Sequence, residues 1–224
     1  MDRGLLARLT REGAGIARAA AVRARLLPYR PEDRSATEWS RAYEGGHLDY
    51  YGRLDELGRY SVTVGYIAWF LREHGARHDA TVLDIGCGTG LLRARLEGLA
   101  FERYVGVDLS ERAVAVARAA GVERSEYLAG DVMSDALALE PADVVVLNEV
   151  LYYAPEPRSF LQRVAQLTAP GGIVVISVWR HRGDTALWRE VADVLELVDR
   201  VRVRNDANPV NRRGWIVACC RPRG

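Results

Sequence analysis

The segment Asp84-Ile85-Gly86-Cys87-Gly88-Thr89-Gly90 has three glycines at alternate positions, directly after an apolar run that begins at Val82. A helical pattern begins at Leu91, so the sequence predicts a strand, a tight turn and the start of a helix. Glycine accepts positive φ angles and lets a ligand lie close to the backbone. The start of a helix offers unpaired N–H groups and the positive end of its dipole. The segment therefore predicts a cradle for a nucleotide-like cofactor that carries a carboxylate.

Predicted strands and helices alternate after this turn. The expected strands are 81–85, 104–108, 126–128, 143–147, 173–178, 201–204 and 215–219, and the expected helices are 91–98, 111–120, 157–167 and 185–197. Pro170-Gly171-Gly172 is expected to end the third of these helices as a turn. Continuous apolar runs such as 144–147 are typical of strands buried on both faces. Repeated strand–helix units form a parallel, doubly wound sheet, with the last two strands as a hairpin at one edge.

The first part of the chain is expected to form a helical and aromatic cap, residues 1–75, before an α/β domain at 76–224, and the two together make one compact unit. Residues 1–27 have the pattern of a basic amphipathic helix. We favour a helix that docks on its own domain or frays over one that contacts a membrane or a partner protein. Tyr66, Trp69 and Phe70 are expected to pack inward from a helix at 59–73.

The composition is that of an ordinary globular protein. The chain has 224 residues and a net charge of +1, which does not favour a nucleic acid or an anionic membrane as a partner. Its three cysteines, Cys87, Cys219 and Cys220, have neither a disulfide framework nor zinc-ligand spacing, so we expect no metal site and a cytoplasmic location. No apolar stretch reaches the ~20 residues of a membrane span, and no signal peptide is expected.

Acidic and amide side chains stand where the predicted strands end. Ligands bind at the carboxyl ends of the strands in such a sheet. Asp108 comes about 20 residues after the glycine turn, where an acid binds the two hydroxyls of a ribose. The dinucleotide pattern G-x-G-x-x-G is not present, since its third glycine would fall on Leu91. Asp131 and the pair Asn148-Glu149 end two further strands.

Five motifs in this order resemble those of class I S-adenosylmethionine-dependent methyltransferases. They are Asp84–Gly90, Gly106–Ser110, Gly130–Val132, Leu147–Tyr153 and Pro170–Gly172, and the resemblance covers roughly residues 60–220. It implies a Rossmann-like, doubly wound sheet of seven strands in the order 3-2-1-4-5-7-6, with strand seven antiparallel. It also implies S-adenosyl-L-methionine as the cofactor and methyl transfer as the reaction.

The resemblance assigns roles to the residues of the cofactor site. The glycine turn, with Asp84, Gly86, Cys87, Gly88 and Gly90, is expected to hold the methionine part. Asp108 is expected to hold the ribose, and Leu109 to pack on the adenine. Asp131 would accept a hydrogen bond from the adenine amino group, with Val132 beside it. Asn148 would lie near the methyl group, and Arg59 and Tyr60 would reach the cofactor carboxylate.

The catalytic base has three candidates in the sequence: Glu149, His47 and His181. If they are not catalytic, Glu149 would cap the following segment, and His181 would be a solvated histidine in a loop. Tyr50, Tyr51, Tyr152 and Tyr153 are expected to shape the acceptor pocket. For His47, Tyr50 and Tyr51, a role in a lid over the pocket and a purely structural packing role are weighted equally. Ubiquinone-type O-methyltransferases are similar around Glu149 but carry a Glu-His pair at the position of Tyr152-Tyr153, so their metal dependence is not carried over.

The favoured function is O-methylation of a hydroxyl on a small molecule, sugar-like or a natural-product intermediate. The alternatives are N-methylation of an amino sugar or small amine, RNA methylation, and a module that binds the cofactor without catalysis. RNA methylation would use the late arginines, which are Arg200, Arg202, Arg204, Arg212 and Arg213. The near-zero net charge does not favour it. A small-molecule acceptor is the expected partner, and a homodimer is left open.

Overall fold

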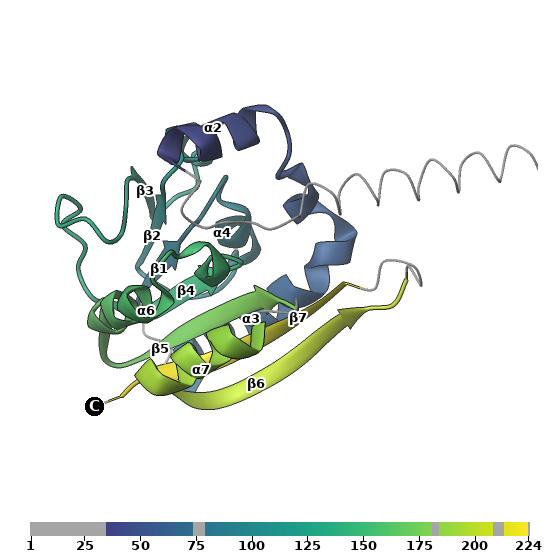
Figure 1. The fold of residues 1–224 in the computed structure, drawn as a ribbon. Coiled ribbons are helices and arrows are strands. Elements are labelled where there is room, and N and C mark those ends of the chain that lie inside the picture. The colour runs from purple at the N-terminus through teal and green to yellow at the C-terminus, as the bar shows by residue number, and fades with distance from the viewer. Residues whose placement is uncertain (1–34, 74–78, 181–183, 208–212, 224) are drawn as a thin grey trace, which may run out of the picture.

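The structure, a computed structural model, describes residues 35–73, 79–180, 184–207 and 213–223 (Figure 1). One mixed sheet of seven strands has the order β3-β2-β1-β4-β5-β7-β6. The strands are β1 (Thr81–Ile85), β2 (Arg103–Asp108), β3 (Ser125–Ala129), β4 (Ala142–Asn148), β5 (Thr168–Trp179), β6 (Leu195–Asn205) and β7 (Arg213–Pro222). β1 to β5 run parallel, and β7 is antiparallel to both of its neighbours. The predicted strand order and the antiparallel seventh strand are confirmed.

Helices cover both faces of the sheet (Figure 1). They are α2 (Ala36–Glu44), α3 (Leu57–Glu73), α4 (Leu91–Arg95), α5 (Glu111–Ala119), α6 (Pro157–Gln166) and α7 (Asp184–Val194), with short 3-10 helices η2 (Asp49–Gly52), η3 (Leu54–Glu56) and η4 (Leu151–Tyr153). Apolar side chains of α6 and α7 pack into one core, and those of α3, α4 and α5 pack into a second core. The sheet lies between the two, as in a doubly wound fold.

The central strand β4 explains the apolar run that the sequence shows at 144–147. All four side chains are fully buried. Val145 and Leu147 belong to the core beneath α6 and α7, whereas Val144 and Val146 belong to the core beneath α3 to α5. Because successive side chains point to opposite faces, a strand covered on both sides has to be apolar at every position.

Helix α3 confirms the helix predicted at 59–73, although it begins two residues earlier, at Leu57. Phe70 is buried, while Tyr66 and Trp69 are partly buried against the same core. The hydroxyl of Tyr66 donates a hydrogen bond of 2.8 Å to Asp199 of β6. The aromatic residues thereby hold α3 against the sheet at its β6–β7 end.

Three predicted boundaries are wrong, and one of them is the end of the helix expected at 91–98, since α4 ends at Arg95. Residues 195–197 begin β6 instead of ending a helix, because Leu195 and Leu197 pair with the C-terminal strand β7. Residues 170–172 lie inside β5 instead of forming a separate turn, since Thr168 already pairs with Ala142 before a register shift. Gly171 absorbs that irregularity with a φ of 79°. Pairing with a strand far along the chain overrides local helix and turn signals here.

Several predictions lie outside the described residues or stay predictions. Residues 1–34, with the basic helix expected at 1–27, and His181 are not described. The division at residue 75 between cap and domain stays a prediction. Within the described ranges, no helix is both long and apolar enough to cross a membrane. The same residues contain no group of three histidine, cysteine or acidic side chains placed to hold a metal ion.

Gly106 of β2 offers a test of how tightly the sheet packs beneath the site. A Cβ on Gly106 would come 2.7 Å from Tyr127 Cδ1 and 2.8 Å from Cys87 Sγ, so Gly106→Ala forces buried atoms to shift. We expect it to lower the free energy of unfolding by about 1–3 kcal/mol, measured by urea denaturation. Gly65→Ala in α3 meets no atom within 4 Å and should raise it by up to about 1 kcal/mol. Equal effects of the two changes would contradict the packing argument.

Candidate cofactor and acceptor site

The predicted site residues come together at the carboxyl ends of four neighbouring strands. Ile85 at the end of β1 pairs with Val107 of β2 and with Leu147 of β4. Asn148 at the end of β4 pairs with Ser177 of β5. The glycine turn, the acid that ends β2 and the polar pair after β4 therefore share one edge of the sheet. Doubly wound folds bind ligands at this edge.

The glycine turn has the backbone conformation that its sequence predicts. Gly86, Gly88 and Gly90 have φ angles of 75°, 53° and 81°. The backbone N–H groups of Gly86 and Cys87 both donate to the carbonyl of Val107, at 2.7 Å and 3.0 Å. A Cβ on Gly86 would lie 2.2 Å from a methyl group of Val150. The turn thus needs glycine for its conformation and also for the space around it.

Asp108 ties the glycine turn to the start of α5. Its carboxylate accepts hydrogen bonds from the N–H of Gly88 at 2.9 Å and from the N–H of Ser110 at 2.8 Å. Burial raises the pKa of Asp108, and these two bonds act in the opposite direction. A carboxylate has about four acceptor positions, so two remain after these bonds. The remaining positions suit the two hydroxyls of a ribose.

Asp84 is a buried carboxylate with one oxygen unsatisfied. The hydroxyl of Tyr104 donates to Oδ2 at 2.5 Å. The other oxygen, Oδ1, is buried and has no hydrogen-bond partner among the described residues. Burial raises the pKa of Asp84 to about 7. An orphaned acceptor beside the glycine turn requires a donor. The ammonium group of S-adenosylmethionine would supply one, so these residues fit the expected cofactor.

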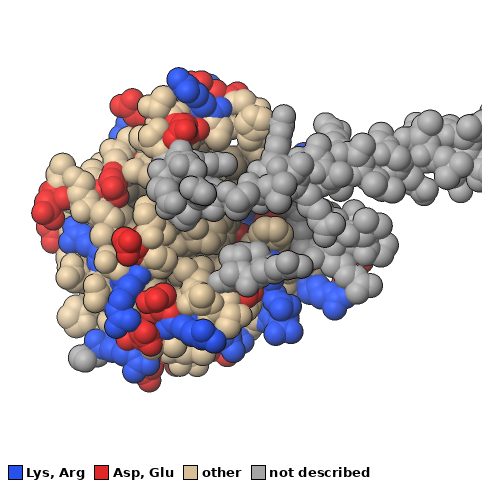
Figure 2. All heavy atoms as spheres, viewed as in Figure 1, with Lys and Arg blue, Asp and Glu red and all other residues tan. Residues whose placement is uncertain are grey.

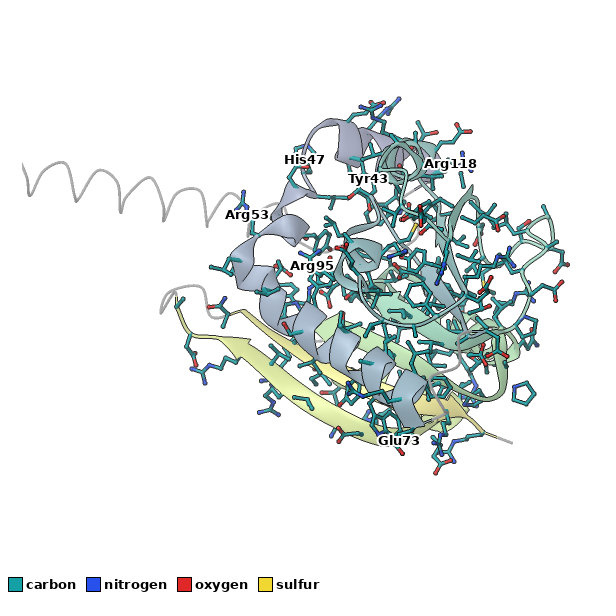
Figure 3. The ribbon with its side chains drawn as sticks, turned by 180° about the vertical axis from the view of Figure 1, so that it is seen from behind. Tyr43, His47, Arg53, Glu73, Arg95 and Arg118 are labelled. Carbon is teal, nitrogen blue, oxygen red and sulfur yellow. The ribbon has the colours of Figure 1, made fainter. Side chains whose placement is uncertain are left out.

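Tyr43 is a site residue that the sequence reasoning missed. It comes from α2, the helix that lies over the strand ends in Figure 3. Its hydroxyl lies 2.7 Å from the position that a Cβ on Gly88 would take. Burial raises its pKa, with Asp108 as the next cause. Tyr43 follows Trp39 by four residues, and this i, i+4 spacing on one helix face was the available signal.

Arg59 is almost fully buried, with 1% of its surface exposed, and it joins α3 to β4. Its Nε donates to Glu56 at 2.8 Å, and its Nη1 donates to Oδ1 of Asn148 at 2.5 Å. Tyr60 lies beside it, and its ring is contacted by the guanidinium groups of Arg59 and Arg95 at 4.1 Å and 4.0 Å. The bonds to Glu56 and Asn148 hold Arg59 and Asn148 in place at the strand ends.

Glu149 lies at the centre of the second half of the site. It is 5% exposed and has a φ of 63°, which is uncommon for a residue other than glycine. Its carboxylate accepts from Ser177 Oγ at 3.0 Å and from the Tyr152 hydroxyl at 3.1 Å. Burial raises its pKa to about 7, although Arg59 and the two hydrogen bonds act against that rise. Strained backbone and a perturbed carboxyl together are typical of functional sites.

Ser177 of β5 connects the two polar groups. Its hydroxyl lies 2.8 Å from Oδ1 of Asn148 and 3.0 Å from Oε1 of Glu149, and the N–H of Glu149 donates to it at 3.1 Å. A hydroxyl has one proton, so Ser177 can donate to only one of these oxygens at a time. The sequence reasoning missed Ser177. A lone polar residue in the apolar strand 173–178 was the available signal.

The four tyrosines predicted for the acceptor pocket gather above Glu149. The rings of Tyr50 and Tyr51 lie 4.3 Å apart, and those of Tyr152 and Tyr153 lie 4.4 Å apart. Trp39 of α2 meets Tyr153 edge to face at 4.7 Å. Burial raises the pKa of Tyr51, and the nearby Tyr153, Tyr50 and Glu149 act in the same direction, so these groups lie close together. The structure therefore brings two distant segments into one aromatic cluster.

His47 is not brought into this cluster by any contact of the described residues. Its side chain is exposed, and its ring packs close to Gly45 in the turn after α2. Figure 3 shows it at the outer end of α2. The proposal that His47 acts as a base stays a prediction, and so does that for His181, which lies outside the described residues.

The residues expected around the adenine occupy the ends of β2 and β3. Leu109 is 38% exposed, so its side chain has a free face. Asp131 is exposed, and its Oδ1 accepts from the N–H of Met133 at 2.9 Å. Val132 is buried in the core beneath α6. Their positions agree with an adenine at this end of the sheet, but their roles stay predictions.

Residues 83–176 match a protein family described as a methyltransferase domain. A ubiquinone biosynthesis O-methyltransferase from Cronobacter sakazakii is 32% identical over 179 residues, which cover 75% of this chain and 71% of that protein. A protein of the same name from Leptothrix cholodnii is 36% identical over 116 residues, 49% of this chain. That match spans only 48% of the Leptothrix protein.

Two solved structures share the fold. An N-methyltransferase, NodS, from Bradyrhizobium japonicum in complex with S-adenosyl-L-homocysteine has a TM-score of 0.63 at 20% identity, covering 79% of this chain and 92% of that chain. A magnesium protoporphyrin IX methyltransferase from Synechocystis with bound S-adenosylmethionine has a TM-score of 0.62 at 16% identity, covering 83% and 96%. At these identities the likeness concerns the fold alone.

Asp108→Ala tests the assignment of the ribose position. The change removes a carboxylate that would accept hydrogen bonds from the two ribose hydroxyls. We therefore expect the affinity for S-adenosylhomocysteine, measured by calorimetry, to fall at least about tenfold. Glu111→Ala, in the first turn of α5 and exposed, should leave the affinity unchanged. Thermal unfolding of both variants checks that the glycine turn still forms. Wild-type affinity in a folded Asp108→Ala protein would contradict the assignment.

Proposed function

Since the chain belongs to the class I S-adenosylmethionine-dependent methyltransferases, we propose that it transfers a methyl group to a hydroxyl of a small molecule. The buried carboxyl group of Glu149, at the strand edge expected to bind the cofactor, carries the proposal. A hydroxyl acceptor has to lose its proton during transfer, whereas an amine needs only to be neutral. The relatives named O-methyltransferases support the same choice of acceptor atom.

The residues of the glycine turn and of β2 would hold the cofactor. When bound, S-adenosylmethionine supplies an electrophilic methyl group on a positively charged sulfur. Asp84 would accept from its ammonium group, and Asp108 would accept from its ribose hydroxyls. Leu109 and Asp131 would contact the adenine. Tyr43 would close the turn from above, because its hydroxyl already lies next to Gly88.

Glu149 would act as the general base. With a pKa of about 7, it is partly ionised at neutral pH and strong enough to take a proton. General bases work best with a pKa near the working pH. A phenolic hydroxyl, with a pKa near the value of about 10 for tyrosine, is within easier reach of such a base than an alkyl hydroxyl. We therefore favour an acceptor with a hydroxyl on an aromatic ring over a sugar hydroxyl.

Ser177 and Tyr152 would position Glu149 and stabilise its ionised form. Each donates a hydrogen bond to one carboxylate oxygen. When Glu149 takes up a proton, the hydroxyl of Ser177 can turn to Asn148, which lies 2.8 Å away. The positive charge of Arg59 lowers the pKa of Glu149 and so stabilises its ionised carboxylate.

The aromatic cluster would form the acceptor pocket. The rings of Trp39, Tyr50, Tyr51, Tyr152 and Tyr153 offer flat apolar faces and polar edges. Such rings stack on other aromatic rings in offset or edge-to-face arrangements. They would also exclude water from the reacting atoms, which strengthens electrostatic interactions inside the site. The cluster supports a small and flat acceptor.

Glu149→Gln tests the base. The amide keeps the shape of the side chain but cannot take the proton from the hydroxyl that is to be methylated. We therefore expect the turnover number to fall about 10²–10⁴-fold. Cofactor affinity should stay within about twofold in calorimetry. Glu156→Gln, an exposed residue before α6 without a capping hydrogen bond, is the matched control. Full turnover in the Glu149→Gln enzyme would rule out Glu149 as the base and reopen an amine as the acceptor.

Ser177→Ala tests the hydrogen bond to the base through pH. The ionised form of Glu149 is the active one, so kcat/KM should rise with pH through its pKa of about 7. Ser177 stabilises that form, and its removal should shift the acidic limb upward by roughly half to one pH unit. Ser177→Thr keeps the hydroxyl and should restore the profile, and Ser61→Ala is an exposed control. An unshifted limb would show that Ser177 has no such role.

A further inference from the structure

A second concave surface lies between α7 and the β5–β7–β6 end of the sheet. It has a volume of about 530 Å³ and is separate from the glycine turn. Its lining residues are Arg180, Asp184, Thr185, Trp188, Arg200, Arg202 and Ile216. We call this surface the α7 hollow. Among the residues that the structure describes, neither the proposed cofactor residues, nor Glu149, nor the aromatic cluster lines it.

Strand pairing explains why three arginines meet there. Arg200 and Arg202 of β6 pair with Ala218 and Ile216 of β7, and Ile216 pairs with Val178 of β5. Directly paired residues share a face of the sheet, and residues two apart on one strand do so as well. Arg180 follows Val178 by two residues and is therefore expected on that face too. This is the face that α7 covers.

The charges of the α7 hollow are unbalanced. Asp184 is the single acid among its described lining residues, 3.8 Å from the Nε of Arg180. Arg200 and Arg202 form no ion pair or side-chain hydrogen bond with any residue of the described ranges. Arg204, the next arginine on this face of β6, instead pairs with Asp206 at 2.5 Å. Two exposed guanidinium groups thus line the α7 hollow without a counter-charge among the described residues.

The first turn of helix α7 adds backbone hydrogen-bond donors to the same surface. Asp184 and Thr185 form its first turn, where backbone N–H groups have no partner within the helix. The indole Nε1–H of Trp188, one turn later, is buried without an acceptor among the residues that the structure describes. The ring of Trp188 and the side chain of Ile216 provide apolar area next to the arginines. Donors, positive charge and a flat apolar wall therefore occur together.

We propose that the α7 hollow binds a small organic anion, through a phosphoryl or carboxylate group held by Arg200 and Arg202. Guanidinium groups bind both oxyanions through paired N–H···O bonds. The organic part of the ligand lies against Trp188 and Ile216. Figure 2 shows basic side chains, with acidic ones among them, on the lower face of the molecule, where α7 and β6 lie in Figure 1.

Phenyl phosphate is a suitable probe because it combines an oxyanion with a flat ring. We expect it to bind the full chain at physiological salt in calorimetry, whereas phenol at the same concentration does not bind. Arg200→Ala combined with Arg202→Ala should weaken binding by about tenfold or more. Arg204→Ala, on the same strand but paired with Asp206, is the matched control and should stay within about twofold.

The Trp188 side chain gives an independent readout. Its indole N–H resonance, assigned by its loss in Trp188→Phe, should shift in nitrogen–proton correlation spectra as phenyl phosphate is added. No binding up to about 10 mM, equal weakening by Arg204→Ala, or an unshifted Trp188 resonance would overturn the proposal. These measurements need neither cofactor nor turnover, so they can fail or succeed separately from the proposed methyl transfer.

A kinetic experiment distinguishes the two sources of such an anion. If the anionic group belongs to the methyl acceptor, Arg202→Ala should raise KM for that acceptor with little change in kcat. If the anion is a separate molecule, KM should stay unchanged while phenyl phosphate binding is lost. Either result supports an anion site, and only the first makes the α7 hollow a part of the acceptor site proposed above.

Discussion

The attachment of the glycine turn to the end of β2 is the constraint on which the site depends. Two N–H groups of the turn donate to the carbonyl of Val107, and a third donates to the carboxylate of Asp108. These bonds require a backbone that only glycine adopts readily, with positive φ at alternate positions. Because Asp108 also accepts from the start of α5, one carboxylate aligns a strand end, a turn and a helix. A cofactor meets a cradle that is already formed.

The second half of the site depends on a buried polar chain that runs from α3 through β4 to β5. Hydrogen bonds link Glu56 to Arg59 and Arg59 to Asn148, and the hydroxyl of Ser177 donates either to Asn148 or to Glu149. A buried charge is costly unless it is paired and hydrogen-bonded, and here each member has such a partner. The burial that makes these polar groups costly in free energy also raises the pKa of Glu149 to about 7, where a carboxyl group can exchange protons at neutral pH.

The family resemblance implied the strand order, which the structure confirms. The sequence also predicted which polar residues end the strands, because these motifs are short and local, whereas their roles toward a cofactor stay predictions. Sequence reasoning failed where distant pairing decides the outcome. Residues 195–197 have a helical pattern but pair with β7, and 168–172 join β5 through pairing with β4. Tyr43 and Ser177 were missed, since the local signals at these positions do not show that the side chains lie next to Gly88 and Glu149. The predicted bases His47 and His181 gained no support from the described contacts.

The sequence by itself determined the glycine turn, the acids at the strand ends and the apolar strands, because each follows from the conformational freedom or burial of single residues. The tertiary structure alone decided what surrounds them. It placed α2 and Tyr43 over the turn, joined two tyrosine pairs from distant segments above Glu149, and left Arg200 and Arg202 unpaired on the face beneath α7. Helix docking and strand register bring these groups together, and both depend on contacts between residues far apart in the chain.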